Sequence, residues 1–172
     1  MNYRSALFLV ALLASGPAFA GQIETCFTPG QDCTGVIVRE IDGARRSVLV
    51  QAYSFTSAPI AKALVDAKRR GVDVRVVLDK SQRSERYSGA DFLANQGVRV
   101  TIDAAHAIAH NKVMVLDGGT VITGSFNFTF SAQEKNAENL IVIHGDREIA
   151  DRYAENWGRH AAHSEPYRGR GE

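Results

Sequence analysis

Short apolar runs alternate with helical patterns from residue 35 to residue 102, and this alternation constrains the fold more than any other feature. Helix boundaries can be located within it, because Pro59 lies in the first turn of one helical segment and Gly71 follows its end. Strands that alternate with helices favour a mixed or parallel sheet with helices on its faces. The strand-like runs occupy residues 47–53, 72–78 and 98–102, and the helical segments occupy residues 35–44, 58–70 and 85–95.

The second half of the chain has a different pattern. Three strand-like runs occur at residues 112–116, 120–123 and 139–144, and the turn Asp117-Gly118-Gly119 predicts a hairpin between the first two. An amphipathic pattern predicts a closing helix over residues 146–162. At 172 residues the chain is expected to form one α/β domain, with a mixed, largely parallel β-sheet flanked by helices.

The first twenty residues have the composition of a secretory signal peptide. Arg4 supplies a positive charge, residues 6–14 are apolar, and Ala18-Phe19-Ala20 matches a cleavage site. An uncleaved membrane anchor is the alternative, and the polar residues that follow Ala20 favour cleavage. We therefore expect a periplasmic or secreted protein that has no stable membrane association once the signal peptide is removed.

The chain has two cysteines, Cys26 and Cys33, and the turn pair Pro29-Gly30 lies between them. In an oxidising compartment they are expected to form a disulfide that closes a small loop. Two free thiols, or a bond to another chain, are the alternatives. No histidine or further cysteine lies nearby at zinc-binding spacing, so no metal is expected at this loop.

The charge of the chain is balanced, with 20 Lys and Arg against 19 Asp and Glu, so global charge does not indicate a nucleic-acid partner. Basic residues do cluster locally at Lys68-Arg69-Arg70, and phosphate binding needs only a locally positive surface. For any one of these residues, an ordinary solvated face is the alternative.

Four polar residues around the predicted hairpin carry the chemistry of the chain. His110 and Lys112 are two positions apart, which places both side chains on one face of a strand, and Ser125 and Asn127 repeat this spacing. Together they offer a nucleophile, a cation and two neutral hydrogen-bonding groups, which is what phosphoryl transfer without a metal requires. A His-x-Lys pair by itself is more often an ordinary surface pair, so the whole pattern carries the inference.

The spacing H-x-K-x4-D-x6-G-S-x-N, from His110 to Asn127, resembles the signature of the phospholipase D superfamily. The chain is similar to its small bacterial endonucleases, which carry this motif once and resist chelators. The similarity covers residues 34–165 and includes further segments at residues 51–56, 67–74, 123–129 and 135–139. It implies a phospholipase D/nuclease-like fold over residues 35–165. From the residues themselves we expect a signal peptide (1–20) and an N-terminal segment (21–34) before this domain, and a flexible tail (166–172) after it.

The resemblance implies that His110 is the nucleophile and forms a covalent phosphohistidine. In this superfamily a second histidine serves as general acid and then activates water. Because the motif occurs once here, the resemblance implies a homodimer in which each chain contributes one His110 across a two-fold axis. No cofactor and no catalytic metal are expected, since Lys112 would supply the positive charge.

The other motif positions receive roles from the same resemblance. Lys112 would hold a phosphate oxygen, Asn127 would donate through its amide, and Ser125 would bind phosphate or support the network. Glu138 would hydrogen-bond the His110 ring and orient it.

Two further motif residues are expected to be structural. Asp117 would bond the backbone in its own turn, and Gly124 would let the backbone approach the phosphate closely. No role is expected for the remaining histidines, His106, His144, His160 and His163, and Phe126, Phe128 and Phe130 are expected in the core.

These residues favour an exported, metal-independent phosphodiesterase, and its small size favours DNA as the substrate, with RNA as a further one. A phospholipase D-like lipid hydrolase or transphosphatidylase is the first alternative, because the motif identifies a phosphodiester and not its alcohol. A non-catalytic nucleic-acid-binding protein is the second, and the complete set of catalytic positions speaks against it.

Overall fold

The computed structural model describes residues 21–170, so the expected signal peptide and the last two residues lie outside the described residues. The eight strands are β1 (Gln22–Thr28), β2 (Ser47–Ala52), β3 (Asp73–Asp79), β4 (Arg99–Asp103), β5 (Lys112–Leu116), β6 (Thr120–Gly124), β7 (Glu138–His144) and β8 (Glu165–Tyr167). The helices are α1 (Cys33–Gly43), α2 (Ala58–Arg69), α3 (Ala90–Asn95), α4 (Phe130–Glu134) and α5 (Arg147–His163), with a 3-10 turn, η1, at Lys80–Arg83.

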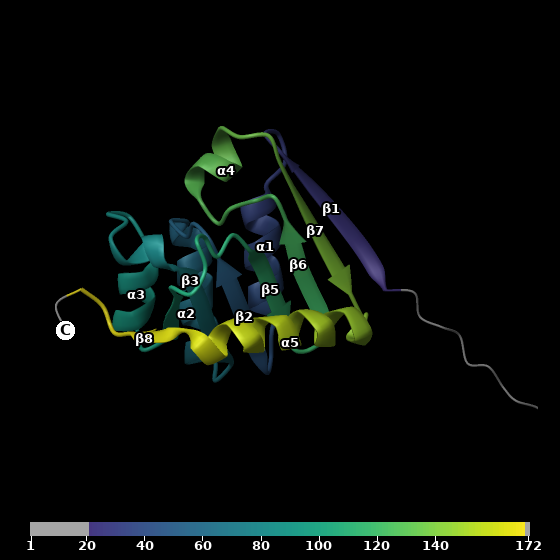
Figure 1. Cartoon of the computed structure of the whole chain (residues 1–172). Helices are drawn as coiled ribbons and strands as arrows, with labels where there is room; N and C mark the ends of the chain where they lie inside the picture. Colours follow the sequence, from purple (N-terminus) through teal and green to yellow (C-terminus); the bar gives the residue numbers. More distant parts are fainter. Residues whose placement is uncertain (1–20, 171–172) are drawn as a thin grey trace, which may run out of the picture.

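All eight strands form one mixed sheet in the order β1-β7-β6-β5-β2-β3-β4-β8 (Figure 1). The predicted α/β class and mixed sheet are confirmed, but the expectation of a largely parallel sheet is wrong. Only β2, β3 and β4 pair in parallel, and the other neighbouring strands are antiparallel. Parallel pairing needs a long crossover, which α2 and the η1–α3 segment supply, whereas the later strands return through short turns.

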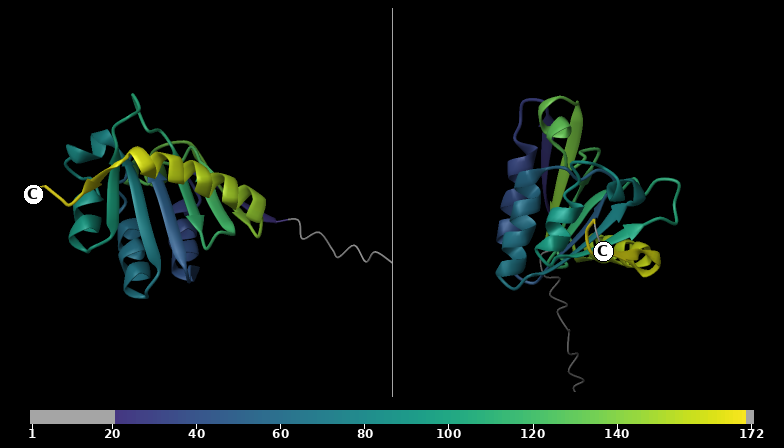
Figure 2. Two further views of the ribbon diagram at one scale, coloured as in Figure 1. Left: turned by 60° about the horizontal axis from the view of Figure 1, so that its bottom comes forward. Right: turned by 90° about the vertical axis from the view of Figure 1, so that its left-hand side faces the viewer.

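Helices cover both faces of the sheet (Figure 2). The helices α1, α2 and α3 pack on one face, where they enclose the larger hydrophobic core. The helix α5 crosses the other face, with Ile149 and Tyr153 against the smaller cluster around Val115 and Val121. Its Trp157 side chain is buried and donates a hydrogen bond to the carbonyl of Val50 at 2.8 Å, which anchors the helix to the middle of the sheet.

Both ends of the described chain are more ordered than the sequence predicts. The strand β1 has mostly exposed side chains and therefore no clear alternating pattern, yet it pairs along its whole length with β7. The predicted disulfide between Cys26 and Cys33 is present and joins β1 to α1. At the other end, where a flexible tail is expected from residue 166, Tyr167 lies in β8 and is buried.

The middle of the chain differs in one element. The helix expected over residues 85–95 is shorter, because α3 begins at Ala90 and an irregular loop precedes it. Phe126 and Phe128 are fully buried as predicted, but Phe130 begins α4 with 63% of its surface exposed.

No helix among residues 21–170 is long and apolar enough to span a membrane.

Candidate active site

The motif residues gather at one edge of the sheet, where β5 and β7 begin and β2 and β6 end. Lys112 pairs with Ala52, and Gly124 pairs with Leu140, so the strand register brings these ends together. His110 precedes β5, whereas Ser125 and Asn127 follow β6. The helix α4 lies above the same edge (Figure 1).

His110 and Lys112 share a contact with Tyr53. The exposed His110 ring lies 4.6 Å from the Tyr53 ring, centroid to centroid. The Lys112 ammonium is 5.3 Å from the Tyr53 centroid and donates a hydrogen bond to the His110 carbonyl oxygen at 2.7 Å. Tyr53 therefore contacts both groups, although the resemblance, whose 51–56 segment contains it, assigns it no role. The sequence signal is its place at the end of the predicted 47–53 strand.

The loop that delivers His110, residues 104–111, is held by buried carboxylates at the ends of β3 and β4. Asp79 is 1% exposed and accepts a hydrogen bond from the Ala109 amide at 2.7 Å. Asp103 is fully buried and accepts one from the Ala105 amide at 3.1 Å. Burial alone would raise the pKa of Asp79, but hydrogen bonds from Ser81 and Ala109 outweigh it and lower that pKa below its ordinary value. Ionised Asp79 thus holds the residue next to His110.

Ser125 and Glu138 form a second hydrogen-bonded group. The Ser125 hydroxyl donates to Glu138 at 2.6 Å and accepts from the backbone amide of Asn139 at 3.0 Å. The other oxygen of Glu138 accepts from the side-chain amide nitrogen of Asn136 at 3.0 Å. Among residues 21–170 there is no hydrogen bond between Glu138 and the His110 ring, so the predicted orienting role of Glu138 stays a prediction. In this chain its carboxylate orients Ser125.

Asn127 presents an unusual polar group. Its Oδ1 atom is buried and has no hydrogen-bond partner among the described residues, and the same holds for Nε2 of Gln51 in β2. Buried polar atoms without partners cost free energy and are rare in native proteins. This oxygen is an acceptor, so the donation to phosphate that the motif position predicts for the Asn127 amide nitrogen stays a prediction.

Asp117 and Gly124 have structural surroundings that differ in detail from expectation. The Asp117 carboxylate accepts hydrogen bonds from the backbone amides of Arg45, Arg46 and Ser47 at 2.7–2.9 Å. It therefore fixes the segment that leads into β2, whereas the sequence predicts a hydrogen bond within its own turn. At Gly124 (φ +139°) a Cβ would clash with the Asn139 carbonyl oxygen. Glycine is therefore required at position 124 by its close approach to strand β7, and the expected approach to a phosphate stays a prediction.

The Lys112 side chain is only 7% exposed, and its environment changes its protonation. Burial disfavours the charged form and lowers the pKa of Lys112, although the nearby Glu138 carboxylate opposes that shift. Lys112 consequently loses its proton at a lower pH than an exposed lysine, whose pKa is about 10.4.

This shift predicts the alkaline limb of the pH profile. As pH rises through the lowered pKa of Lys112, the positive charge is lost and kcat/KM should fall. Replacement of Lys112 by arginine, which stays charged, should move that limb to higher pH in whatever activity remains. A profile measured for both proteins checks this, and an alkaline limb at the same pH in both would assign it to another group.

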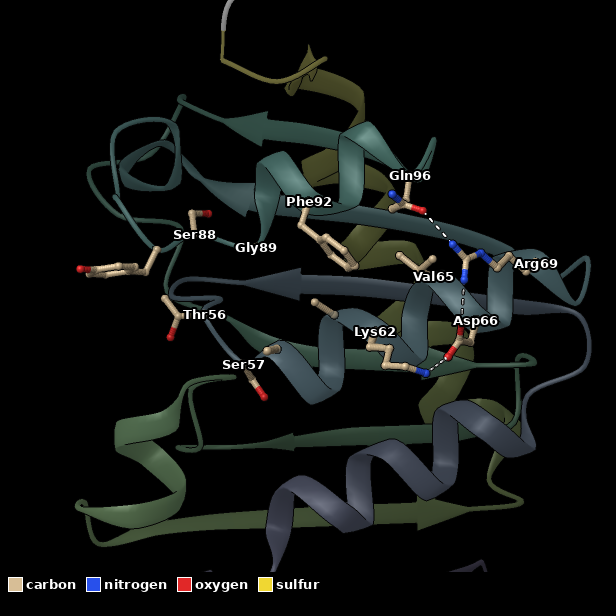
Figure 3. A pocket seen from close by; sticks show the side chains of 13 residues that line it. Thr56, Ser57, Lys62, Val65, Asp66, Arg69, Ser88, Gly89, Phe92 and Gln96 are labelled. Carbon is tan, nitrogen blue, oxygen red and sulfur yellow. Dashed lines mark hydrogen bonds and ion pairs between the residues drawn. The ribbon is translucent and has the colours of Figure 1, made fainter.

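A groove of about 520 Å³ lies between α2 and α3 on the helical face (Figure 3). Phe92 lines it, Thr56 and Ser57 lie at one end, and Lys62 and Arg69 pair with Asp66. None of the motif residues lines this groove, so the chemistry belongs to the sheet edge.

Comparison with known proteins identifies the family. The profile of the family described as cardiolipin synthase, PLD-like domain, matches residues 37–160. A protein named phospholipase D from Rickettsia felis is 46% identical over 136 residues, which cover 79% of this chain and 68% of that protein. A mitochondrial cardiolipin hydrolase from Xenopus laevis is 37% identical over 117 residues, 68% of this chain and 55% of that protein.

Solved structures agree with this family. Nuc from Salmonella typhimurium, a phospholipase D family member, superposes with a TM-score of 0.84 at 37% identity, covering 87% of this chain and 99% of Nuc. NucT from Helicobacter pylori has the same fold, with a TM-score of 0.79 at 23% identity, covering 86% of this chain and 99% of NucT. With the motif residues gathered at the sheet edge, these matches show that the chain belongs to the phospholipase D superfamily of phosphodiesterases and carries one copy of its motif.

Proposed function

We propose that this phosphodiesterase is an exported nuclease that cleaves DNA, and RNA as well, without a metal ion at the reacting centre. Two similar solved structures bear the names Nuc and NucT, which points to nucleic acids. The single observation that carries the metal-independent mechanism is the placement of Lys112. The residue is nearly buried, and its ammonium lies 2.7 Å from the His110 carbonyl oxygen, so a fixed positive charge stands next to the residue proposed as nucleophile.

The reaction takes two displacements. A ring nitrogen of His110 attacks phosphorus, a nitrogen–phosphorus bond forms, and the phosphorus–oxygen bond to the leaving alcohol breaks while a second imidazole protonates that oxygen. Water then attacks the phosphohistidine, gives its proton to the second imidazole, and releases the phosphate product and free His110. Lys112 and Asn127 would hold the non-bridging oxygens throughout.

The second imidazole would come from a second copy of the chain. Every other histidine has a partner away from the motif, since His106, His160 and His163 surround Asp103 and His144 lies 3.7 Å from Glu40. Two copies related by a two-fold axis would bring the exposed His110 rings together. Each ring would then act as nucleophile or as acid and base.

Loops around the sheet edge support a nucleic-acid substrate. Arg86 lies over the Tyr87 ring at 5.5 Å, and Lys135 lies over the Phe130 ring at 5.9 Å. Tyr87 and Phe130 are 72% and 63% exposed, and α4 and the loop that follows η1 carry these pairs toward solvent. Exposed aromatic rings beside cations are the groups that bind single-stranded nucleic acids through stacking and phosphate contacts.

A lipid substrate is the second candidate function. It is favoured by relatives named phospholipase D and mitochondrial cardiolipin hydrolase, which the chain matches at 46% and 37% identity. The chemistry at His110 would be identical, because a phospholipid and a nucleic acid present the same phosphodiester.

The test offers both substrates to one preparation in the presence of excess chelator. Plasmid DNA, single-stranded DNA and vesicles that contain cardiolipin are incubated with the mature protein and with a His110→Asn variant as the matched control. We expect chelator-resistant cleavage of DNA that the variant lacks. Lipid turnover without DNA cleavage would contradict the proposed substrate. Loss of all activity in chelator while circular dichroism shows that the protein stays folded, with recovery only on addition of a divalent ion, would contradict the metal-independent mechanism.

A further inference from the structure

A cluster of three histidines surrounds one buried carboxylate away from the motif residues. Asp103 ends β4, His106 follows in the loop 104–111, and His160 and His163 belong to the last turn of α5. Atom Oδ2 of Asp103 lies 3.0 Å from Nδ1 of His106, 2.7 Å from Nδ1 of His160 and 3.2 Å from Nε2 of His163. Segments far apart in the sequence thus point four metal-binding side chains at one position.

The donor set and its spacing match a closed zinc site. All four ligand atoms lie within 4.8 Å of one another. Around a tetrahedral zinc with bonds of about 2.0–2.1 Å, ligand atoms lie about 3.3 Å apart, and the distances from the Asp103 oxygen are 2.7–3.2 Å. Small outward movements of the rings would therefore admit the ion. We propose that Asp103, His106, His160 and His163 bind one structural zinc ion.

Hydrogen bonding to the carboxylate is the competing explanation of this arrangement, and the metal content measured below separates the two. Three ring nitrogens face Oδ2, while Oδ1 accepts the Ala105 amide at 3.1 Å and also lies 3.1 Å from Nδ1 of His106. A zinc ion would instead take one lone pair from each ring and one from the carboxylate. The Ala105 amide would then orient the ligating carboxylate, as outer hydrogen bonds do in metal sites.

Access to the site is also suitable. The side chains of His106 and His163 are 45% and 39% exposed, whereas Asp103 is fully buried. An ion can therefore enter between the two exposed rings and reach the carboxylate beneath them. Four protein ligands would leave no open position for a reacting water, which makes the site structural and not catalytic.

The proposed ion would connect α5 to the loop that delivers the nucleophile. His106 lies four residues before His110, and the Lys80 ammonium donates to the His106 carbonyl oxygen at 2.9 Å. Zinc would tie this loop to the C-terminal end of α5 and so stabilise the folded protein. Chemistry at His110 would not pass through the ion.

The test measures bound metal and stability in the mature protein. Metal analysis after extensive dialysis against zinc-free buffer, and titration of the chelator-stripped protein with zinc, should give about one equivalent per chain. A hundredfold excess of zinc over its dissociation constant should raise the Tm by about 5–10 °C. Replacement of zinc by cobalt should give the visible absorption of a tetrahedral ion.

Variants locate the site. The partly exposed His163→Asn should fold, and it should weaken zinc binding by more than the about 10–100-fold that changes to outer-shell partners cost, as should His160→Asn. The matched control is His144→Asn, whose histidine faces Glu24 and Glu40 in the other group of possible ligands. Unchanged zinc binding in this control is expected.

Three results would overturn the proposal. One is a wild-type protein that binds no zinc and shows no change in Tm, which would leave the cluster as hydrogen bonds only. The others are loss of zinc in His144→Asn alone, and zinc that His160→Asn and His163→Asn both retain. Because the readout is metal content and Tm, failure here would leave the proposed nuclease activity untouched.

Discussion

The variant His110→Asn is expected to lose at least about 10⁴-fold in kcat/KM for its phosphodiester substrate, because it has no nucleophile to form the phosphohistidine. The fold should survive, since the His110 side chain is exposed and the loop that carries it is held through backbone amides at Ala105 and Ala109. Steady-state kinetics and the Tm, measured on the same preparation, check both statements.

The matched control for this variant is His144→Asn, which alters a partly exposed histidine of β7 and should keep full activity. A second readout follows a labelled phosphoryl group during turnover. One sample is quenched in acid, which hydrolyses the phosphorus–nitrogen bond of phosphohistidine, and a second is quenched in alkali, which preserves it. Label should remain on wild-type protein only after the alkaline quench. Substantial turnover by His110→Asn would remove this residue from the nucleophile role.

The variant Lys112→Met is expected to lower kcat about 10²- to 10³-fold, the cost of removing one preorganised charge at a transition state. Methionine keeps an unbranched apolar side chain in this nearly buried position, so packing beside Tyr53 should be retained. The free energy of unfolding should stay equal or rise, because a partly buried ammonium is removed. Kinetics and denaturant unfolding of the two proteins measure these effects.

Lys112→Arg separates charge from position. Arginine keeps the charge but cannot reproduce the single hydrogen bond to the His110 carbonyl at 2.7 Å, so partial activity is expected. If Lys112→Met kept the wild-type kcat while its KM rose, Lys112 would stabilise the bound substrate and the transition state equally. The assignment of Lys112 to transition-state stabilisation would then be wrong.

The helices and strands on either side of residue 100 were predictable from hydrophobic spacing, and α2 and α5 lie within a residue or two of their predicted limits. The edge strands β1 and β8 were not, because an edge strand with exposed side chains lacks the alternation that identifies buried strands. The parallel share of the sheet was overestimated for a related reason. An apolar run identifies a strand but does not show whether that strand runs parallel or antiparallel to its neighbours.

The site was predictable where it depends on local spacing. His110 with Lys112, and Ser125 with Asn127, need only a two-residue period to share a face. Tyr53 was missed because its contact with His110 depends on the register of β2 against β5, in which Ala52 pairs with Lys112. The Asp103 cluster was missed because its members come from β4, the following loop and α5, and only the packing of α5 across the sheet joins them.

The central claim is that two identical His110 side chains, one from each copy of the chain, form a single active site. Mixing tests it directly: wild-type and His110→Asn chains carrying different affinity tags are refolded together at varied ratios, and total activity is plotted against the wild-type fraction. If both imidazoles are required, hybrid dimers are inactive and activity follows the square of that fraction, about one quarter at equal mixing. Activity that falls in direct proportion to the wild-type fraction, or full activity in a purified monomer, would contradict the shared site.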